Sequence, residues 1–223
     1  MRADRRQKTE AEMRATNTKQ RPNRWIVALA LVAAATMVSS AAPAESHTWK
    51  VDPAHTEINF SISHFFTPVT GSFEEFEVDL DYDAENPAHS TVEARIKVAS
   101  INTGNQRRDD HLRSADWFEA ETHPYMTFKS TSVQADGDVL LARGLLTIKG
   151  QAHEVELPIK LLGRQPIPEP MREMLGGTRE VASFEASTAV QRKEFGVGVG
   201  NWAQTMVVGG EVEIQILLEA HQS

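Results

Sequence analysis

The residues most able to do chemistry cluster in the run Arg108-Asp109-Asp110-His111, which Arg113 follows closely. A carboxylate and an imidazole this close could ligate zinc, but no third or fourth ligand stands at a recognised spacing, so we predict no metal site. The arginines could instead pair with the phosphate of an anionic headgroup, because a guanidinium offers a planar fork of donors. The third interpretation is a salt-bridged helix that closes one end of the fold. We favour this structural interpretation and retain Arg113 as a candidate binding residue.

Motifs for bond chemistry are missing from the sequence. It has no Gly-x-Ser-x-Gly elbow, no His-Glu-x-x-His pair and no glycine-rich phosphate loop that opens a helix. The run Gly196-Val-Gly198-Val-Gly200 precedes a strand-like segment, which indicates a bend or bulge. We therefore predict no catalytic residues and no cofactor. Arg192 lies just before this run and is either a headgroup contact or a structural arginine that reaches Asp52 or another acid.

An excess of acidic residues narrows the range of partners. The 223 residues carry a net charge of −8, and the first 44 of them hold eight Lys/Arg against three Asp/Glu. The rest therefore holds fifteen basic and twenty-eight acidic residues, a net charge of −13. Such a body repels phosphate backbones, so we predict no nucleic-acid partner. Because the chain has no cysteine, disulfide scaffolds, iron–sulfur clusters and cysteine nucleophiles are excluded.

The first 44 residues have the layout of a Sec-type signal peptide. A polar, basic segment comes first, an apolar stretch of fourteen residues spans 25–38, and small residues end at Ala42-Pro43-Ala44. The apolar stretch is shorter than the roughly 20 residues of a membrane-spanning helix. We expect cleavage after Ala44, export to the periplasm and a mature domain of residues 45–223. An uncleaved membrane anchor is the alternative, because the basic segment is long.

The remainder alternates apolar and polar residues with a period of two, which is the pattern of strands with one dry and one wet face. Such segments run from Ile58 to His64, from Phe76 to Tyr82 and, longest of all, from Val208 to Leu218. Asp136-Gly137 and Lys149-Gly150 separate further short apolar segments and indicate tight turns. We count eight or nine strands without a strand-helix-strand rhythm, which predicts an all-β sandwich or barrel.

One helical insert and one irregular segment interrupt the strands. Thr103-Gly-Asn-Gln106 matches a capping box, which predicts a short helix that starts there. Asp109 and Arg113 then stand four apart in the favoured order for an exposed helical ion pair. Residues 165–179 hold three prolines and a Gly-Gly pair and form a long irregular segment. It is either a lid or a surface loop, and most such loops are only connections.

Several segments carry a family resemblance through their order along the chain. They are Trp49 to His55, Phe60 and His64, Gly71 to Phe73 and Phe76, Ile101 to Thr103, Arg108 to Phe118, Pro124 to Ser130, Gly144 to Gly150 and Arg192 to Val197. Together they resemble the YceI-like family of secreted, lipocalin-like proteins over almost the whole mature chain. Two features depart from the family pattern: Thr56 stands where the family usually has Ser, and residues 165–179 are longer and richer in proline and methionine.

The resemblance implies an eight-stranded, mostly antiparallel, lipocalin-like barrel around an elongated apolar tunnel. In that family the tunnel holds a polyisoprenoid or another long amphiphile. The resemblance also implies a periplasmic, lipid-binding domain over residues 45–223 and suggests a homodimer.

A closed sheet of about eight strands is wide enough either to be filled by side chains or to hold one slender ligand. Each inward apolar residue is therefore either a ligand contact or ordinary core. His64 shares the face of Phe60 and Ile62, so it points inward as a satisfied core residue or as a contact to a headgroup. The candidate ligand-binding residues are Phe60, Ile62, His64, Phe73, Phe76, Val78, Ile96, Arg113, Phe118, Phe128, Ile148, Phe184 and Phe195.

Three functional hypotheses follow. The first is a periplasmic carrier that shields a polyisoprenoid-type lipid, such as a quinone or prenyl carrier, makes transient membrane contact and performs no bond chemistry. The second is an enzyme that acts on a prenyl compound in the same cavity, with His64, His111 or Arg113 as the acid–base group. The third is an envelope stress or interaction protein whose barrel is merely filled. The export signal, the strand pattern and the resemblance favour the carrier.

Overall fold

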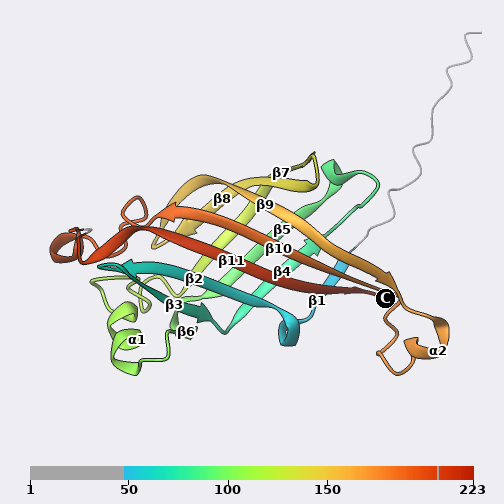
Figure 1. Ribbon diagram of the computed structural model, residues 1–223, viewed down its shortest axis with the longest axis horizontal. Coiled ribbons are helices and arrows are strands. Elements are labelled where there is room, and N and C mark those ends of the chain that lie inside the picture. Colours follow the sequence, from blue (N-terminus) through green and yellow to red (C-terminus); the bar gives the residue numbers. More distant parts are fainter. Residues whose placement is uncertain (1–47, 205) are drawn as a thin grey trace, which may run out of the picture. The chain divides into compact units, whose positions relative to one another are not determined.

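The computed structural model describes residues 48–204 and 206–223, so the predicted signal peptide and its cleavage site lie outside the described residues. Most of the described chain is strand (Figure 1). The strands are β1 (Thr48–Val51), β2 (Glu57–His64), β3 (Thr67–Phe73), β4 (Phe76–Asp81), β5 (Thr91–Lys97), β6 (Ile101–Asn102), β7 (Tyr125–Asp136), β8 (Val139–Ile148), β9 (Gln151–Pro166), β10 (Glu180–Gln191) and β11 (Val208–Gln222).

The helices are short and lie between strands. They are α1 (Gln106–Arg113), α2 (Glu169–Arg172) and four 3-10 helices, η1 (Pro53–His55), η2 (Pro87–His89), η3 (Val98–Ser100) and η4 (Gly200–Trp202). None of the helices in the described ranges has both the length and the apolar character that crossing a membrane requires.

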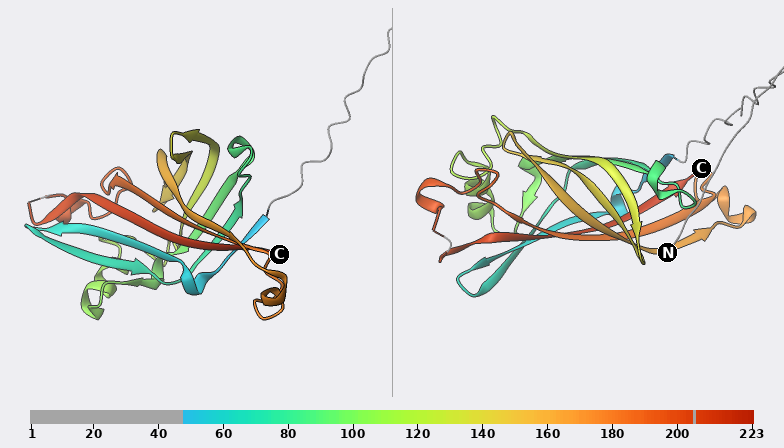
Figure 2. Two further views of the ribbon diagram at one scale, coloured as in Figure 1. Left: turned by 45° about the vertical axis from the view of Figure 1, so that its right-hand side comes forward. Right: turned by 90° about the horizontal axis from the view of Figure 1, so that it is seen from above.

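Eight of the strands close into an antiparallel barrel (Figures 1 and 2). Neighbours follow the order β1-β4-β5-β7-β8-β9-β10-β11, and β1 pairs back onto β11, where Lys50 faces His221. Strands β2, β3 and β6 extend the sheet from the rest of β11. The predicted eight-stranded antiparallel barrel with a short helical insert is therefore confirmed.

Strand β11 runs between two ends of the barrel that differ in structure. At its start Val208 faces His64 of β2, and near its finish His221 faces Lys50 of β1. At about 3.3 Å per residue, this distance along the strand is roughly 40 Å. We call the first the α1 end, because α1 lies there with the β2–β3 turn and the β10–β11 connection (Figure 1). The second is the β1 end, which holds β1, α2 and the C-terminus (Figure 1).

Two tight turns predicted from glycine are present. Asp136 pairs with Val139 across the β7–β8 hairpin, and Gly137 takes a left-handed φ of 60°. Between β8 and β9, Lys149 and Gly150 have φ values of 49° and 74°. A type I′ turn needs positive φ at both central positions, and this turn sets the register of the β8–β9 pairing.

The predicted capping box at the start of α1 is wrong in detail. Asn105 is the N-cap, and its side chain accepts a hydrogen bond from the backbone N–H of Arg108. Thr103 instead donates through its hydroxyl to Asp109, which is buried. Asp109 is therefore not available for the predicted exposed pair with Arg113. A buried carboxylate needs such donors, so Thr103 holds Asp109 and Arg113 pairs with Asp110 instead.

The segment 165–179 is more regular than its composition indicates. Strand β9 continues to Pro166, α2 follows, and Ile167 is buried. The guanidinium of Arg172 donates to the carbonyl of Ile167 at 2.8 Å, and the N–H of Gly177 donates to the carbonyl of Arg172 at 2.8 Å. The segment therefore packs as a capped turn at the β1 end.

Buried apolar side chains form two clusters. The larger one lines the interior from the α1 end and includes Phe73, Trp117, Phe128 and Phe195. The smaller one lies at the β1 end and consists of Trp49, Tyr82, Ala182, Phe184 and Ala220. The space between the walls formed by both clusters is the candidate site.

Candidate ligand-binding cavity

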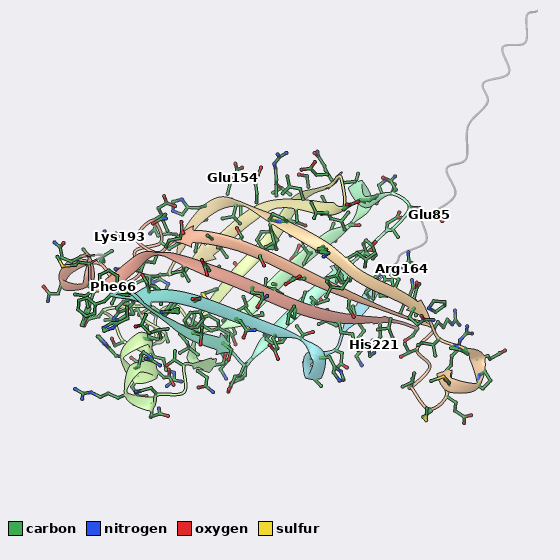
Figure 3. The ribbon with its side chains drawn as sticks, viewed as in Figure 1. Phe66, Glu85, Glu154, Arg164, Lys193 and His221 are labelled. Atoms are coloured by element: carbon green, nitrogen blue, oxygen red, sulfur yellow. The ribbon has the colours of Figure 1, made fainter. Side chains whose placement is uncertain are left out.

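A cavity of about 490 Å³ lies inside the barrel, lined by α1 and by every strand except β1. Its wall is almost entirely apolar. Among the described residues no Asp or Glu lines it, and Arg108 and Arg192 are the only arginines that do. Figure 3 shows Phe66 and Lys193 at the α1 end, and Arg164 and His221 at the β1 end.

Most of the predicted binding residues face this cavity. His64 lies in the wall but is exposed, which puts it at the mouth on the α1 end. The lining includes Phe60, Ile62, His64, Phe73, Val78, Ile96, Phe118, Phe128, Ile148, Phe184 and Phe195. Their role as ligand contacts stays a prediction.

Two predicted binding residues do not line the cavity. Phe76 occupies the first position of β4 and packs against the larger core cluster outside the lining. The guanidinium of Arg113 donates to the carbonyls of Ala99 at 2.9 Å and Ile101 at 2.8 Å, and it pairs with Asp110 at 3.1 Å. Arg113 therefore fixes α1 to the η3–β6 segment, in line with the structural interpretation of this run.

Sequence reasoning missed lining residues of two kinds. Ile214 and Ile216 belong to the longest alternating strand, so the same parity argument would have found them. Trp117 and Trp202 line the cavity from a turn and from η4. Neither segment has a repeating pattern, so the sequence contains no periodic signal for their direction.

Three aromatic rings gather where the cavity meets α1. The centroids of Trp117 and Trp202 lie 5.8 Å apart, and the ring of His111 lies 6.0 Å from the first and 5.0 Å from the second. The turn after α1 positions Trp117, whose backbone N–H donates to the carbonyl of Ser114 at 3.1 Å. The indole N–H of Trp117 is buried and has no acceptor among the described residues.

Arg192 lies at the same end and is only 3% exposed. All five guanidinium N–H groups donate to backbone carbonyls, so the interpretation that pairs Arg192 with Asp52 or another acid is wrong. Burial lowers the pKa of Arg192, because desolvation disfavours its charged form. Arg192 therefore fixes the β10–β11 connection through the carbonyls of Val197, Gly198, Trp202, Val208 and Gly209.

Three polar side chains at the β1 end, those of Trp49, Thr56 and Ser90, have hydrogen-bond partners within the protein. The indole N–H of Trp49 donates to the carbonyl of Tyr82 at 3.0 Å, and the ring of Tyr82 packs edge-on against Phe184 at 5.1 Å. Burial raises the pKa of Tyr82. Thr56 and Ser90, which also line the cavity, accept hydrogen bonds from backbone N–H groups. This end is therefore closed by its own packing and hydrogen bonds.

A family model decides the relationship of this chain to known proteins: the model of the YceI-like domain matches residues 49–220. The chain belongs to the YceI-like family. It is similar to Protein YceI of Escherichia coli O157:H7, at 36% identity over 166 residues that cover 73% of this chain and 83% of that protein. It is also similar to a UPF0312 protein of Pseudomonas aeruginosa strain LESB58, at 33% identity over 76% of this chain and 86% of that protein.

Solved structures share the YceI-like barrel. BcnA of Burkholderia cenocepacia superposes with a TM-score of 0.68 at 28% identity, over 76% of this chain and 99% of that one. A domain of Saccharophagus degradans superposes with a TM-score of 0.55 at 15% identity, over 80% of this chain and 99% of that one. That domain is described as polyisoprenoid binding and implicated in plant cell wall breakdown, and its likeness to this chain shows the fold.

A cluster of titratable side chains in this YceI-like protein lies at the β1 end, and none of its residues lines the cavity. Ligand-type atoms of Asp52, Glu219 and His221 lie within 4.8 Å of one another, a spacing that could hold a metal ion. The absence of a metal site therefore stays a prediction. His55 donates to Asp52 at 2.8 Å, and this bond lowers the pKa of Asp52 and raises that of His55.

Proposed function

We propose that this YceI-like protein is a periplasmic carrier that holds the chain of a polyisoprenoid or similar long amphiphilic lipid in its barrel, without bond chemistry. One observation carries the proposal: the closed barrel encloses a cavity of about 490 Å³ whose described lining contains no Asp or Glu. Such a wall favours a hydrocarbon chain, because a charged metabolite would lose its hydration without gaining partners. The polyisoprenoid binding ascribed to the Saccharophagus degradans domain agrees with this choice.

The volume of the cavity indicates the length of chain that it accommodates. An apolar cavity of about 150 Å³ holds one benzene molecule, so a volume three times larger holds roughly 20 carbon atoms. That number corresponds to about four isoprene units. Each buried methylene contributes about 0.8 kcal/mol before ordering costs, so apolar contact alone is enough for a carrier.

The location and the membrane contact are part of the same proposal. The signal-like first 44 residues and the family support a periplasmic protein. Loading from a membrane is supported by exposed apolar residues beside the cavity mouth. Phe65 and Phe66 form the β2–β3 turn directly after His64, and they are 52% and 100% exposed. The homodimer suggested by the resemblance remains part of the proposal to be tested by the mass of the protein in solution.

An enzyme acting on a prenyl compound is the second candidate. His111 lines the cavity, and its Nε2 lies 3.4 Å from a carboxylate oxygen of Asp116, an arrangement that could orient a general base. If this candidate holds, His111→Ala abolishes turnover of a prenyl substrate and leaves its binding intact. Unchanged prenyl compounds after incubation with the wild-type protein contradict it.

Lipid that co-purifies with the protein tests the carrier proposal directly. Val78 of β4 lines the cavity, so Val78→Trp fills it, whereas its neighbour Glu77 points outward with its side chain 81% exposed. Glu77→Trp is thus a matched control on the same strand. We would purify both variants and the wild type under mild conditions, confirm their folding by thermal unfolding, and identify extracted lipids by mass spectrometry.

The carrier predicts a stoichiometric prenyl lipid with the wild type and with Glu77→Trp, and its loss from folded Val78→Trp. An empty wild-type barrel, from cells that make normal amounts of prenyl lipid, contradicts a tight carrier. Equal amounts of lipid in all three proteins place the lipid outside the barrel and contradict the proposal as well.

A further inference from the structure

The indole N–H of Trp117 is a hydrogen-bond donor that no described residue accepts. The residue is 6% exposed, it lines the cavity, and its indole N–H has no acceptor among the described residues. Buried tryptophan N–H groups usually find a partner, because an unpaired buried donor has lost its water without compensation. An acceptor from outside the protein is therefore expected next to Trp117.

The surroundings of Trp117 hold the indole in place. A Cβ atom built on Gly198 would lie 2.7 Å and 2.9 Å from Cζ3 and Cε3 of the indole, so the backbone of Gly198 covers that edge closely. The guanidinium of Arg192 lies 5.3 Å from the ring centroid, and Trp202 and His111 pack at its sides. In an indole, Nε1 is on the edge opposite Cε3 and Cζ3. The donor is thus directed away from Gly198, on the opposite edge of the ring.

The charges near Trp117 select the chemistry of the acceptor. Arg108 and Arg192 line the cavity at this end, and the described lining offers no carboxylate to a cationic head. The five donors of Arg192 are all taken by carbonyls, and two donors of Arg108 go to Thr103. A lining that presents arginines and no carboxylate favours a neutral or anionic oxygen and disfavours an ammonium group.

We propose that the bound lipid lies with its polar head at the α1 end and that the indole N–H of Trp117 donates a hydrogen bond to an oxygen of that head. The shared chemistry is an acceptor oxygen, whether of an alcohol, a quinone carbonyl or a phosphate. This proposal rests on the proposed carrier function and adds the orientation of the ligand. The hydrocarbon chain then extends towards Tyr82 and Phe184 at the β1 end.

A pair of ligands and a pair of variants separate the hydrogen bond from simple packing. The ligands are a four-unit prenol and the four-unit prenyl hydrocarbon that lacks the hydroxyl. Trp117→Phe keeps an aromatic ring and removes the N–H, and Trp49→Phe makes the same change at the β1 end. Dissociation constants are measured for each combination, with the four-unit prenyl phosphate as a third ligand.

We expect Trp117→Phe to weaken prenol binding about fivefold more than hydrocarbon binding, and phosphate binding by a larger factor of about thirty, because bonds to charged acceptors are stronger. Trp49→Phe should affect prenol and hydrocarbon equally. As a readout in the unaltered protein, the indole N–H resonance of Trp117 should move to lower field with prenol and stay in place with the hydrocarbon.

Equal weakening of both ligands by Trp117→Phe, with no selective shift of the resonance, overturns the assigned hydrogen bond and leaves the carrier function standing. A prenol-specific loss in Trp49→Phe overturns it too, because the head would then lie at the β1 end. If the wild type binds neither prenol nor hydrocarbon, the proposed function itself fails.

Discussion

Two buried tryptophans occupy opposite ends of the barrel and differ in one bond. Trp49, at 3% exposure, donates its indole N–H to the carbonyl of Tyr82 at 3.0 Å. Trp117, at 6% exposure, has no acceptor for the same group among the described residues. The first completes the hydrogen bonding of the β1 end, whereas the second leaves a donor in the wall of a cavity. At the β1 end the protein supplies the acceptor of the indole N–H itself, and at the α1 end we propose that the bound lipid supplies it.

The largest expected effect is the dependence of affinity on ligand length, which tests whether the β1 end is closed. Binding should strengthen by roughly tenfold or more for each isoprene unit up to about four units, because each unit buries further apolar surface. Beyond that length the chain meets Tyr82 and Phe184, and the affinity should level off. Dissociation constants for prenols of one to eight units measure this. A steady gain through eight units would show that the β1 end opens.

Two glycines with similar positive φ, one at each end, distinguish the energetic cost of backbone strain from the cost of a steric clash. Gly198, at the α1 end, has a φ of 60°, and an added Cβ would lie 2.6 Å from Arg192 and 2.7 Å from Trp117. Gly176, in the 165–179 segment, has a φ of 65° and open space around it. Gly198→Ala should cost about 2–4 kcal/mol of unfolding free energy and Gly176→Ala about 1–2 kcal/mol. Equal losses in urea unfolding would show that the packing of Gly198 against the indole is unimportant.

The unfolding free energy of the ligand-free protein tests the difference between the tryptophans themselves. Trp49→Phe leaves the carbonyl of Tyr82 without its donor, whereas Trp117→Phe breaks no hydrogen bond within the described chain. Trp49→Phe should therefore destabilise the protein by about 1–2 kcal/mol more than Trp117→Phe. Urea unfolding of both variants after lipid extraction checks this. The reverse order would mean that Trp117 has an acceptor within the protein.

The smallest effect concerns the pair of Asp52 and His55 at the β1 end. The bond between them raises the pKa of His55. The contribution of this bond to folding stability is therefore complete below the ordinary pKa of about 6.5 and is lost as the pH rises through the raised value. The bond also lowers the pKa of Asp52. Its contribution to folding stability is therefore complete above the ordinary pKa of about 3.9 and is lost as the pH falls through the lowered value.

His55→Gln should therefore lower the melting temperature slightly, by about 1–2 °C, at pH 5.5 and not at pH 9. Neither His55 nor Asp52 lines the cavity, so ligand binding should be the same in this variant. A melting temperature that falls equally at both pH values would show that packing, rather than charge, is the role of His55.

Much of the barrel could be predicted from the sequence because each strand repeats one physical rule. Alternation marks which face of β2 or β11 is dry, and Gly137 and Gly150 mark where hairpins turn. The capping of α1 could not be decided, since Thr103 and Asn105 both offer a suitable oxygen near the start of the helix. Thr103 bonds to Asp109 because Asp109 is buried, and this leaves Asn105 as the cap. The burial of Asp109 depends on tertiary packing, which the local sequence does not report.

The cavity could be predicted in part for the same reason. Parity correctly placed Phe60 and Val78 on the inner face, but it does not report depth along the barrel, so Phe76 shares that face and still lies outside the lining. Arg113 and Trp117 are positioned by turns and carbonyls around α1. Such residues follow no period, and only the fold reveals which of them faces the cavity.

The orientation of the lipid is the most direct test of the central claim. The chain has four tryptophans, of which Trp49, Trp117 and Trp202 follow the expected cleavage site, so the mature protein should give three indole N–H resonances. A four-unit prenol with a nitroxide label on the end of its hydrocarbon tail would be bound to nitrogen-15-labelled protein. The account predicts broadening of the Trp49 resonance, with Trp117 and Trp202 remaining sharp. Broadening of Trp117 with a sharp Trp49, or no selective broadening at saturating ligand, would contradict it.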